Sequence, residues 1–366
     1  MKILVVDDSA LMRQTITKIL STIANAEIKA ARDGEDALEK LVSWQPDVVT
    51  LDINMPNMDG ITCLSHIMIK RPTPVVIVSS LAQEGAIATL EALHLGAVDF
   101  VAKPGGTICT NLVEMEDVIR QKVVAARKMR VNALTDELVQ EPKPTTKPIA
   151  ETPAKQERES EHYHSRGLSI IGVSTGGPGA VEALLQHLPQ GYPMPIIVAQ
   201  HMPESFTAAF ATRLNRSLDL SVEEISYATV LKPGHVYVCK GDRDCVVTMR
   251  DNALVAMPAP MESKYTWHPS ISKLVSSALR VCGAQNLVCT MMTGMGNDGA
   301  QEMAAVAAGG GSVYAQTPDS CVVPSMVSAL INLNGSVHTA KPDNLGQLML
   351  QGARLVLAKG VHDGVS

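Results

Sequence analysis

The stretch Leu168-Ser-Ile-Ile-Gly-Val-Ser-Thr-Gly-Gly-Pro-Gly179 changes from apolar to small residues around Ser174. A strand-prone run ends at Gly172, and apolar residues recur at helical spacing after Pro178. The sequence therefore predicts that Ser174 sits in a strand-to-helix turn, where glycines let the chain bend sharply and hold a hydroxyl clear of the sheet. Two interpretations are open on this stretch alone. Ser174 is a nucleophile, or the stretch is a tight glycine turn that caps a helix or binds phosphate.

Length and composition favour two globular domains. The 366 residues are 46% hydrophobic, which is enough to bury two cores. The formal net charge of -6 argues against binding to nucleic acid by general electrostatics. The seven cysteines contain no C-x-x-C pair, which predicts neither a disulfide framework nor a zinc knuckle. Asp7 and Asp8 interrupt the apolar start, and no later apolar run is long enough to span a bilayer. We expect a cytoplasmic protein without direct membrane insertion.

The first part of the chain, up to Arg130, alternates short β runs with amphipathic helical segments. Such alternation predicts a parallel sheet with helices on both faces. The strand candidates are Ile3–Val6, Asp47–Leu51, Pro74–Val78 and Val98–Ala102. In this architecture the chemistry collects at the carboxyl ends of the strands. The polar residues expected at those ends are Asp7, Asp8, Asp52, Ser79 and Lys103.

These polar residues predict a shared site. Three carboxylates that converge in one crevice repel one another, which makes them a natural site for a hard, oxygen-liganded cation such as Mg²⁺. A lysine and a hydroxyl nearby can hold the oxygens of a phosphoryl group. Any one acidic residue at a loop start is commonly a turn former or helix cap. The coincidence of five suitable residues at strand ends favours the site.

The same residues lie in motifs of a known family. Asp7-Asp8-Ser9, Leu51–Gly60 and Lys103-Pro104 resemble the receiver domain of two-component response regulators. The resemblance implies a flavodoxin-like fold with a five-stranded parallel sheet over residues 1–130. The roles that it implies are phosphorylation at Asp52, Mg²⁺ binding by Asp8, Asp52 and the Asn54 carbonyl with support from Asp7, a switch hydroxyl at Ser79, phosphoryl contact by Lys103 and a switch aromatic at Phe100.

A change of composition marks a linker over residues 131–165. The segment Glu141–Pro148 is rich in proline, and the residues after it are mostly charged or polar. Such a composition cannot form a core, so we expect a flexible connector that lets the two domains move relative to each other.

The third part of the chain, residues 166–360, contains further buried-strand patterns. Pro195–Ala199 is followed by His201, and Leu287–Thr293 is followed by Asp298. If these runs and the run before Ser174 are parallel strands, the three side chains share one edge of the sheet. We expect a doubly wound α/β domain with a mainly parallel sheet.

The three side chains suit nucleophilic catalysis. A serine hydroxyl is a poor nucleophile until an imidazole accepts its proton, and the imidazole needs an acceptor on its other nitrogen. Asp298 can hold His201 in this way, and His201 can serve Ser174. The glycines of Gly294-Met-Gly296 permit a turn in which the Met295 amide points at a developing oxyanion.

Other interpretations exist for each residue. A histidine such as His201 is more often structural than a base, and Asp298 before a glycine can be a turn. The order Ser, His, Asp also departs from that of α/β-hydrolases. His187, His235 and His268 are rival bases, but they lack the same position after an apolar strand.

A second resemblance favours the catalytic interpretation. Gly172–Gly177, Gln200–Pro203, Lys232–Tyr237 and Thr293–Gly299 resemble the catalytic domain of the chemotaxis protein-glutamate methylesterase (CheB) family. Joined to a receiver by a linker, this is the whole architecture of that family. The resemblance implies a triad of Ser174, His201 and Asp298, with the Met295 amide in the oxyanion hole. Trp267–Ile271 resembles a family loop near the active site and is assigned no catalytic task.

The resemblance implies a function. We expect a phosphorylation-activated response regulator that hydrolyses glutamate γ-methyl esters on methyl-accepting chemoreceptors and also deamidates receptor glutamines. A chemotaxis histidine kinase is the expected phosphodonor, Mg²⁺ serves phosphorylation, and the esterase step needs no cofactor. The protein is expected to be a monomer. The alternative is a receiver joined to a non-catalytic, partner-binding output domain, whereas DNA binding is disfavoured by the acidic charge balance.

Overall fold

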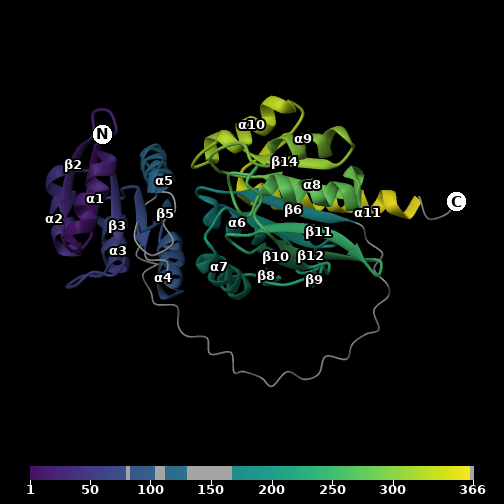
Figure 1. Ribbon diagram of the computed structural model, residues 1–366, viewed down its shortest axis with the longest axis horizontal. Helices are drawn as coiled ribbons and strands as arrows, with labels where there is room; N and C mark the ends of the chain where they lie inside the picture. Colours follow the sequence, from purple (N-terminus) through teal and green to yellow (C-terminus); the bar gives the residue numbers. More distant parts are fainter. Residues whose placement is uncertain (80–82, 104–111, 130–166, 363–366) are drawn as a thin grey trace, which may run out of the picture.

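The computed structural model describes residues 1–79, 83–103, 112–129 and 167–362. The first domain comprises the described residues up to 129, and the second domain comprises residues 167–362. Figure 1 shows the two domains side by side, with α4 of the first next to α7 of the second. The predicted linker, residues 131–165, lies outside the described residues.

The first domain is built on five parallel strands in the order β2-β1-β3-β4-β5. This confirms the predicted five-stranded parallel sheet. Asp52 and Ser79 are the last residues of β3 and β4, rather than the residues that follow them. The elements are β1 (Lys2–Val6), α1 (Ala10–Leu20), β2 (Glu27–Ala31), α2 (Gly34–Trp44), β3 (Val48–Asp52), α3 (Gly60–Lys70), β4 (Val75–Ser79), α4 (Gln83–His94), β5 (Asp99–Ala102) and α5 (Leu112–Ala126).

The strands of the first domain bury both faces, as their β-branched runs predict. One face packs against α1 and α5, and the other packs against α2, α3 and α4. Serine and aspartate begin the first three helices, because the side chains of Ser9, Asp33 and Asp59 accept hydrogen bonds from amides in the first turn.

The second domain contains a seven-stranded sheet in the order β15-β14-β13-β6-β7-β10-β8. All of its strand pairs are parallel, which confirms the predicted mainly parallel sheet. The strands are β6 (Leu168–Val173), β7 (Ile196–Gln200), β8 (Ser221–Ile225), β10 (His235–Cys239), β13 (Leu287–Met291), β14 (Ser312–Gln316) and β15 (His338–Ala340).

Helices cover both faces of this sheet. Apolar residues of α6, α7 and α11 pack on one face, and those of α8, α9 and α10 pack on the other. The helices are α6 (Gly177–Leu185), α7 (Glu204–Ser217), α8 (Ile271–Cys282), α9 (Ala300–Ala308), α10 (Ser325–Leu333) and α11 (Pro342–His362), with short 3₁₀ turns at Ala284–Asn286 and Pro318–Ser320. No helix in the described ranges has the length and apolar character needed to cross a bilayer.

A small antiparallel sheet is a feature that the sequence analysis did not predict. Its strands, in the order β11-β12-β9, are β11 (Asp244–Arg250), β12 (Ala253–Ala259) and β9 (Thr229–Val230). Asp251 and Asn252 join β11 to β12 with φ values of +47° and +61°. Asp and Asn tolerate these values in a two-residue hairpin turn, so the dipeptide was a usable signal.

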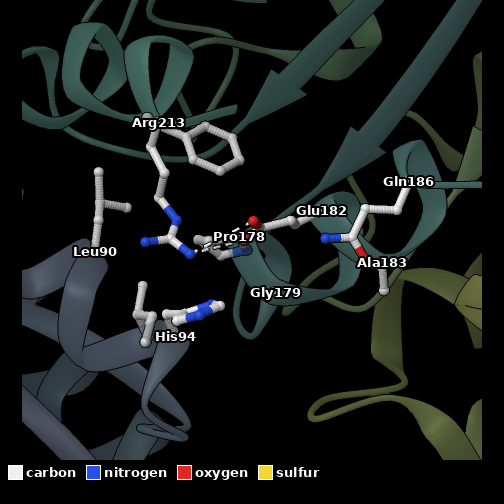
Figure 2. A pocket seen from close by; sticks show the side chains of 10 residues that line it. Leu90, His94, Pro178, Gly179, Glu182, Ala183, Gln186 and Arg213 are labelled. Atoms are coloured by element: carbon white, nitrogen blue, oxygen red, sulfur yellow. Dashed lines mark hydrogen bonds and ion pairs between the residues drawn. The ribbon is translucent and has the colours of Figure 1, made fainter. Parts of the chain in front are cut away.

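The two domains share a continuous apolar core. Phe100 of β5 stacks on Phe206 of α7 with ring centroids 4.6 Å apart, and buried apolar residues of both domains form one cluster. A cavity of about 230 Å³ lies between α4 and the helices α6 and α7. Figure 2 shows Leu90 and His94 on one side of it and Arg213 on the other. The first domain therefore packs on the helices that follow β6 and β7.

We expect Tyr192→Phe to destabilise the second domain. The Tyr192 hydroxyl lies 2.7 Å from Ser169 Oγ in β6 and donates to the Met349 carbonyl of α11 at 3.3 Å. Because Ser169 is fully buried, removal of the hydroxyl leaves it without this partner, at a cost of about 1–3 kcal/mol. Urea unfolding should show this loss, and Ser169→Ala in addition should recover part of it. Unchanged stability of the single variant would contradict the role of this bond.

Candidate active site

Ser174 occupies the turn between β6 and α6. Its amide donates to the Thr293 carbonyl at 2.9 Å, and its own carbonyl accepts from the Gly177 amide at 2.8 Å and from Gln200 Nε2 at 2.9 Å. Gly176, the residue before α6, has a φ of +75°, a conformation that favours glycine. Ser174 is 8% exposed. The backbone of Ser174 is thus held from three sides at the carboxyl edge of the sheet.

His201 lies next to this turn, at the end of the neighbouring strand. The parallel register pairs Val173 with Gln200, and the His201 amide donates to the Val173 carbonyl at 3.1 Å. Nε2 of the His201 ring is 2.9 Å from Oδ2 of Asp298. The structure therefore brings His201 and Asp298 into direct contact and places Ser174 one residue beyond the strand position that pairs with Gln200.

Asp298 lies in the loop between β13 and α9, and its carboxylate contacts the N-terminus of α8. Its carboxylate accepts hydrogen bonds from the amides of Ile271 at 2.7 Å and Ser272 at 3.0 Å, and from Ser270 Oγ at 3.2 Å. Burial by itself raises the pKa of Asp298, but the bond from His201 and the helix amides outweigh it, so the pKa lies below its ordinary value. Asp298 is therefore ionised at neutral pH.

This ionisation sets the tautomer of His201. An ionised carboxylate only accepts hydrogen bonds, so Nε2 carries the proton and Nδ1 presents a lone pair. Nδ1 is buried and has no hydrogen-bond partner among the described residues, so the Ser174 hydroxyl is not bonded to the ring. Catalytic hydrogen bonds are often unformed without substrate. Nδ1 is the ring nitrogen through which this histidine can take a proton.

The loop after β13 lies against Ser174. A Cβ placed on Gly294 would lie 2.7 Å from Ser174 Cβ and would clash with Met326 Sδ, so only glycine fits. Met295 follows in a partly exposed position, and its amide donates no hydrogen bond to any described residue. The Met295 amide is therefore a free donor next to Gly294, at the position where an oxyanion donor is expected.

The rival histidines have other partners. His187 and His235 use Nδ1 on the carbonyls of Ala183 and Pro233, each a few residues away in the chain. His268 has a carboxylate partner, because its Nδ1 lies 2.7 Å from Asp244 Oδ1, but it belongs to the loop before α8 rather than to a strand end.

Several supporting residues were missed from the sequence. Ser270 and Ser272 contact Asp298 through side chain and backbone, and Gln200 braces the backbone of Ser174. Trp267, which was given no task, stacks on the His201 ring. The Trp267–Ile271 motif pointed to this loop, but its partners are close only in three dimensions.

The predicted carboxylate cluster is present in the first domain. Carboxylate oxygens of Asp7, Asp8 and Asp52 lie within 4.8 Å of one another. Lys103 Nζ lies 2.6 Å from Asp52 Oδ2 and 3.0 Å from Asp7 Oδ2. Burial, with a smaller effect of Asp7, raises the pKa of Asp52 against the opposing effect of Lys103. This set of oxygen donors fits a hard divalent cation.

The other predicted receiver residues lie on or after strands β3, β4 and β5. Ser79 Oγ donates to the Gly85 carbonyl of α4 at 3.3 Å, and Asn54 lies in an exposed position two residues after β3. Phe100 is 5% exposed and packs against the second domain. Strand β5 thus carries Phe100 of the domain contact and is followed directly by Lys103, which pairs with Asp52.

The two folds and their sites are those of a response regulator with a hydrolase-type output domain. Residues 3–111 match the family model of the response regulator receiver domain, and residues 169–349 match that of the CheB methylesterase. A protein-glutamate methylesterase/protein-glutamine glutaminase of Vibrio cholerae is 60% identical, with 97% of each chain covered. One of Rhodospirillum rubrum is 46% identical, with 92% of this chain and 91% of the relative covered.

This chain belongs to the CheB family of protein-glutamate methylesterase/protein-glutamine glutaminases. Both resemblances found in the sequence are thereby confirmed. The crystal structure of the Thermotoga maritima CheB methylesterase catalytic domain is 27% identical, with a TM-score of 0.49, and the match covers 50% of this chain and 97% of that chain.

We expect Gly294→Ala to slow the reaction of Ser174 with a serine-directed fluorophosphonate. The added methyl group displaces Ser174 or Met326, and a shift of about 1 Å costs on the order of 100-fold. Gly179→Ala is the matched control, because a Cβ there has no atom within 4 Å. The labelling rate and the melting temperature should be measured together. Labelling of Gly294→Ala at the control rate would show that Ser174 tolerates the displacement.

Proposed function

We propose that this protein is a phosphorylation-activated methylesterase of the chemotaxis adaptation system. Its substrates are the γ-methyl esters of glutamates in methyl-accepting chemoreceptors, and receptor glutamines are deamidated at the same site. The names of its relatives support this activity. The observation that carries it is the His201–Asp298 bond at 2.9 Å beside the Ser174 turn. The family membership disfavours a non-catalytic, partner-binding output.

In the first half of the proposed reaction, the Ser174 hydroxyl attacks the ester carbonyl while His201 Nδ1 takes its proton. The imidazolium that forms is stabilised by the ionised Asp298 at Nε2. The negative charge on the tetrahedral oxygen is held by the Met295 amide. The intermediate collapses when the C–O bond to methanol breaks and His201 returns the proton to the leaving oxygen.

In the second half, water hydrolyses the acyl-enzyme by the same route. His201 takes a proton from water, the hydroxide attacks the acyl carbon, and the bond to Ser174 breaks as the serine regains a proton. The product is a receptor glutamate. A glutamine side chain forms the same acyl intermediate with ammonia as the leaving group, which explains the paired activities in the names of the relatives. This step is proposed to need no cofactor.

The first domain is proposed to be the phosphorylation switch. Asp52 accepts the phosphoryl group from a chemotaxis histidine kinase, and Lys103 contacts its oxygens. Asp8, Asp52 and the Asn54 carbonyl would hold Mg²⁺, with support from Asp7. When bound, this ion neutralises the charge that builds up on the phosphoryl oxygens. Ser79 turns toward the phosphoryl group in the phosphorylated state.

The domain contact suggests how the switch acts. The helices α6 and α7, on which the first domain packs, begin within three residues of Ser174 and His201. We propose that the unphosphorylated first domain restricts access to this edge and that phosphorylation loosens the contact at Phe100. The protein is further proposed to act in the cytoplasm as a monomer.

Ser174→Ala should abolish methanol release from methylated receptor membranes, because no other group at this edge is proposed to form the acyl-enzyme. Ser221→Ala is a suitable control, since Ser221 is exposed on β8. Methanol is measured after kinase-dependent phosphorylation of both variants. Release by Ser174→Ala at the control rate would remove Ser174 as the nucleophile.

Leu93→Asp should raise methanol release by the unphosphorylated protein, by on the order of 10-fold. Leu93 lines the cavity at the domain contact, so a charge there opposes the packing of the first domain against the second. Ile87→Asp is the matched control on the same helix, because Ile87 is 59% exposed. The two variants should converge on the same rate once phosphorylated. If both leave the unphosphorylated rate unchanged, the contact does not restrain the enzyme.

A further inference from the structure

Trp267 lies flat against the imidazole of the proposed base. The ring centroids of Trp267 and His201 are 5.4 Å apart, and the ring planes are inclined by 12°. The indole also lies close to the loop after β13, because Trp267 Nε1 is 3.5 Å from the position that a Cβ on Gly296 would take. Trp267 thus bridges the histidine and the loop that carries Met295, and His201 is left with a side-chain exposure of 4%.

A buried carboxylate holds the loop that carries Trp267. Asp244, at the start of β11, is 1% exposed. It accepts from His268 Nδ1 at 2.7 Å, from the Ser270 amide at 3.1 Å and from Lys273 Nζ at 3.1 Å. These contacts fix the chain immediately after Trp267 and the first turn of α8.

The same lysine closes the other end of the loop. Lys273 Nζ donates to the Pro260 carbonyl at 2.9 Å and pairs with Glu262 at 2.8 Å. The Glu262 amide also donates to Asp244 at 3.3 Å. Residues 260–270 are therefore anchored at both ends, although they contain no helix or strand. An anchored loop is able to hold an aromatic side chain in one place.

The stack supplies a restraint that the His201–Asp298 bond lacks. One hydrogen bond at Nε2 sets a distance, but it leaves the imidazole free to turn about the line that joins the two residues. A turn of this kind moves Nδ1, the nitrogen with the lone pair. An indole packed on the ring face opposes the turn, because tilting the imidazole breaks the contact of the two faces.

The stack also favours the charged form of the ring. His201 becomes an imidazolium when it takes the proton of Ser174, and the face of an indole attracts a cation. An interaction that strengthens as the charge develops lowers the barrier rather than tightening substrate binding. We infer that Trp267 is a positioning residue, which holds the His201 ring plane so that Nδ1 stays directed toward Ser174 and stabilises its charged form. This role rests on the proposed function.

Kinetics of three variants test the role. Trp267→Leu removes the aromatic face and should lower kcat by on the order of 10- to 100-fold without a matching change of KM. Trp267→Phe keeps an aromatic face and should recover most of kcat. Trp44→Phe, in the first domain, is the control. Equal losses in the Leu and Phe variants, a wild-type kcat in Trp267→Leu, or a change confined to KM would each overturn the inference.

The rate of Ser174 labelling by a fluorophosphonate separates this inference from the proposed function, because it needs the activated serine but no methyl ester. Slower labelling in Trp267→Leu, but not in Trp267→Phe, supports the inference even if the wild-type protein releases no methanol, a result that would refute the proposed function alone. Labelling of both variants at the wild-type rate overturns the inference whatever the outcome for methanol.

Fluorescence tests the stack without any reaction. The chain has two tryptophans, so Trp44→Phe leaves Trp267 as the only tryptophan emitter. A protonated imidazole in contact with an indole quenches its emission, so acidification should quench Trp267. The titratable or charged groups near this pair are His201, Asp298, His268, Asp244, Glu262 and Lys273. Quenching should vanish in His201→Ala and persist in His268→Asn. Quenching that follows His268 alone, or none at all, would overturn the inference.

Discussion

The arrangement of the candidate active site in the second domain depends on the carboxylate of Asp298. A buried charge is stable only when hydrogen bonds replace the water that it has lost. Here the amides of Ile271 and Ser272 supply them, together with the partial positive charge of a helix N-terminus. Those contacts keep Asp298 ionised. Its carboxylate can therefore also accept a hydrogen bond from Nε2 of His201. The tautomer of the histidine is thus set by the position of α8, an element that contributes no residue to the predicted triad.

Close approach of backbones is the second constraint on this edge. The parallel register of β6 and β7 places His201 beside Val173, and the carbonyl of Thr293 binds the Ser174 amide from the other side. Three chain segments meet there with almost no side-chain volume between them. The lack of space at Gly294 and the positive φ of Gly176 explain why small residues surround the serine in the sequence. Their role is to let the segments touch.

Much of this could be predicted from the sequence, because the decisive signals are local. Apolar runs of strand length that are followed by Ser174, His201 and Asp298 predicted a common edge, since the carboxyl ends of parallel strands coincide. The carboxylates of the first domain followed in the same way. The Trp267 stack and the Phe100–Phe206 stack could not be predicted, because Trp267 lies in a loop and Phe206 on a helix, where the strand-end rule does not place them. The β11–β12 hairpin was missed for a different reason. Its turn residues, Asp251 and Asn252, are typical of a hairpin turn but were not interpreted as one.

The nature of the domain contact bears on how a phosphoryl group could act at a distance. Phe100 stacks on Phe206 and also contacts Lys122, whose Nζ lies 5.2 Å from the ring centroid and donates to the Phe100 carbonyl. A stacked aromatic pair contributes only about 0.5–1.5 kcal/mol beyond its buried area. Such a contact is strong enough to bias two domain arrangements and weak enough for a local change to reverse the bias. Since α7 begins three residues after His201, the proposed switch needs no long pathway. The ring that is proposed to respond to phosphorylation already packs on α7, the helix that follows the proposed base.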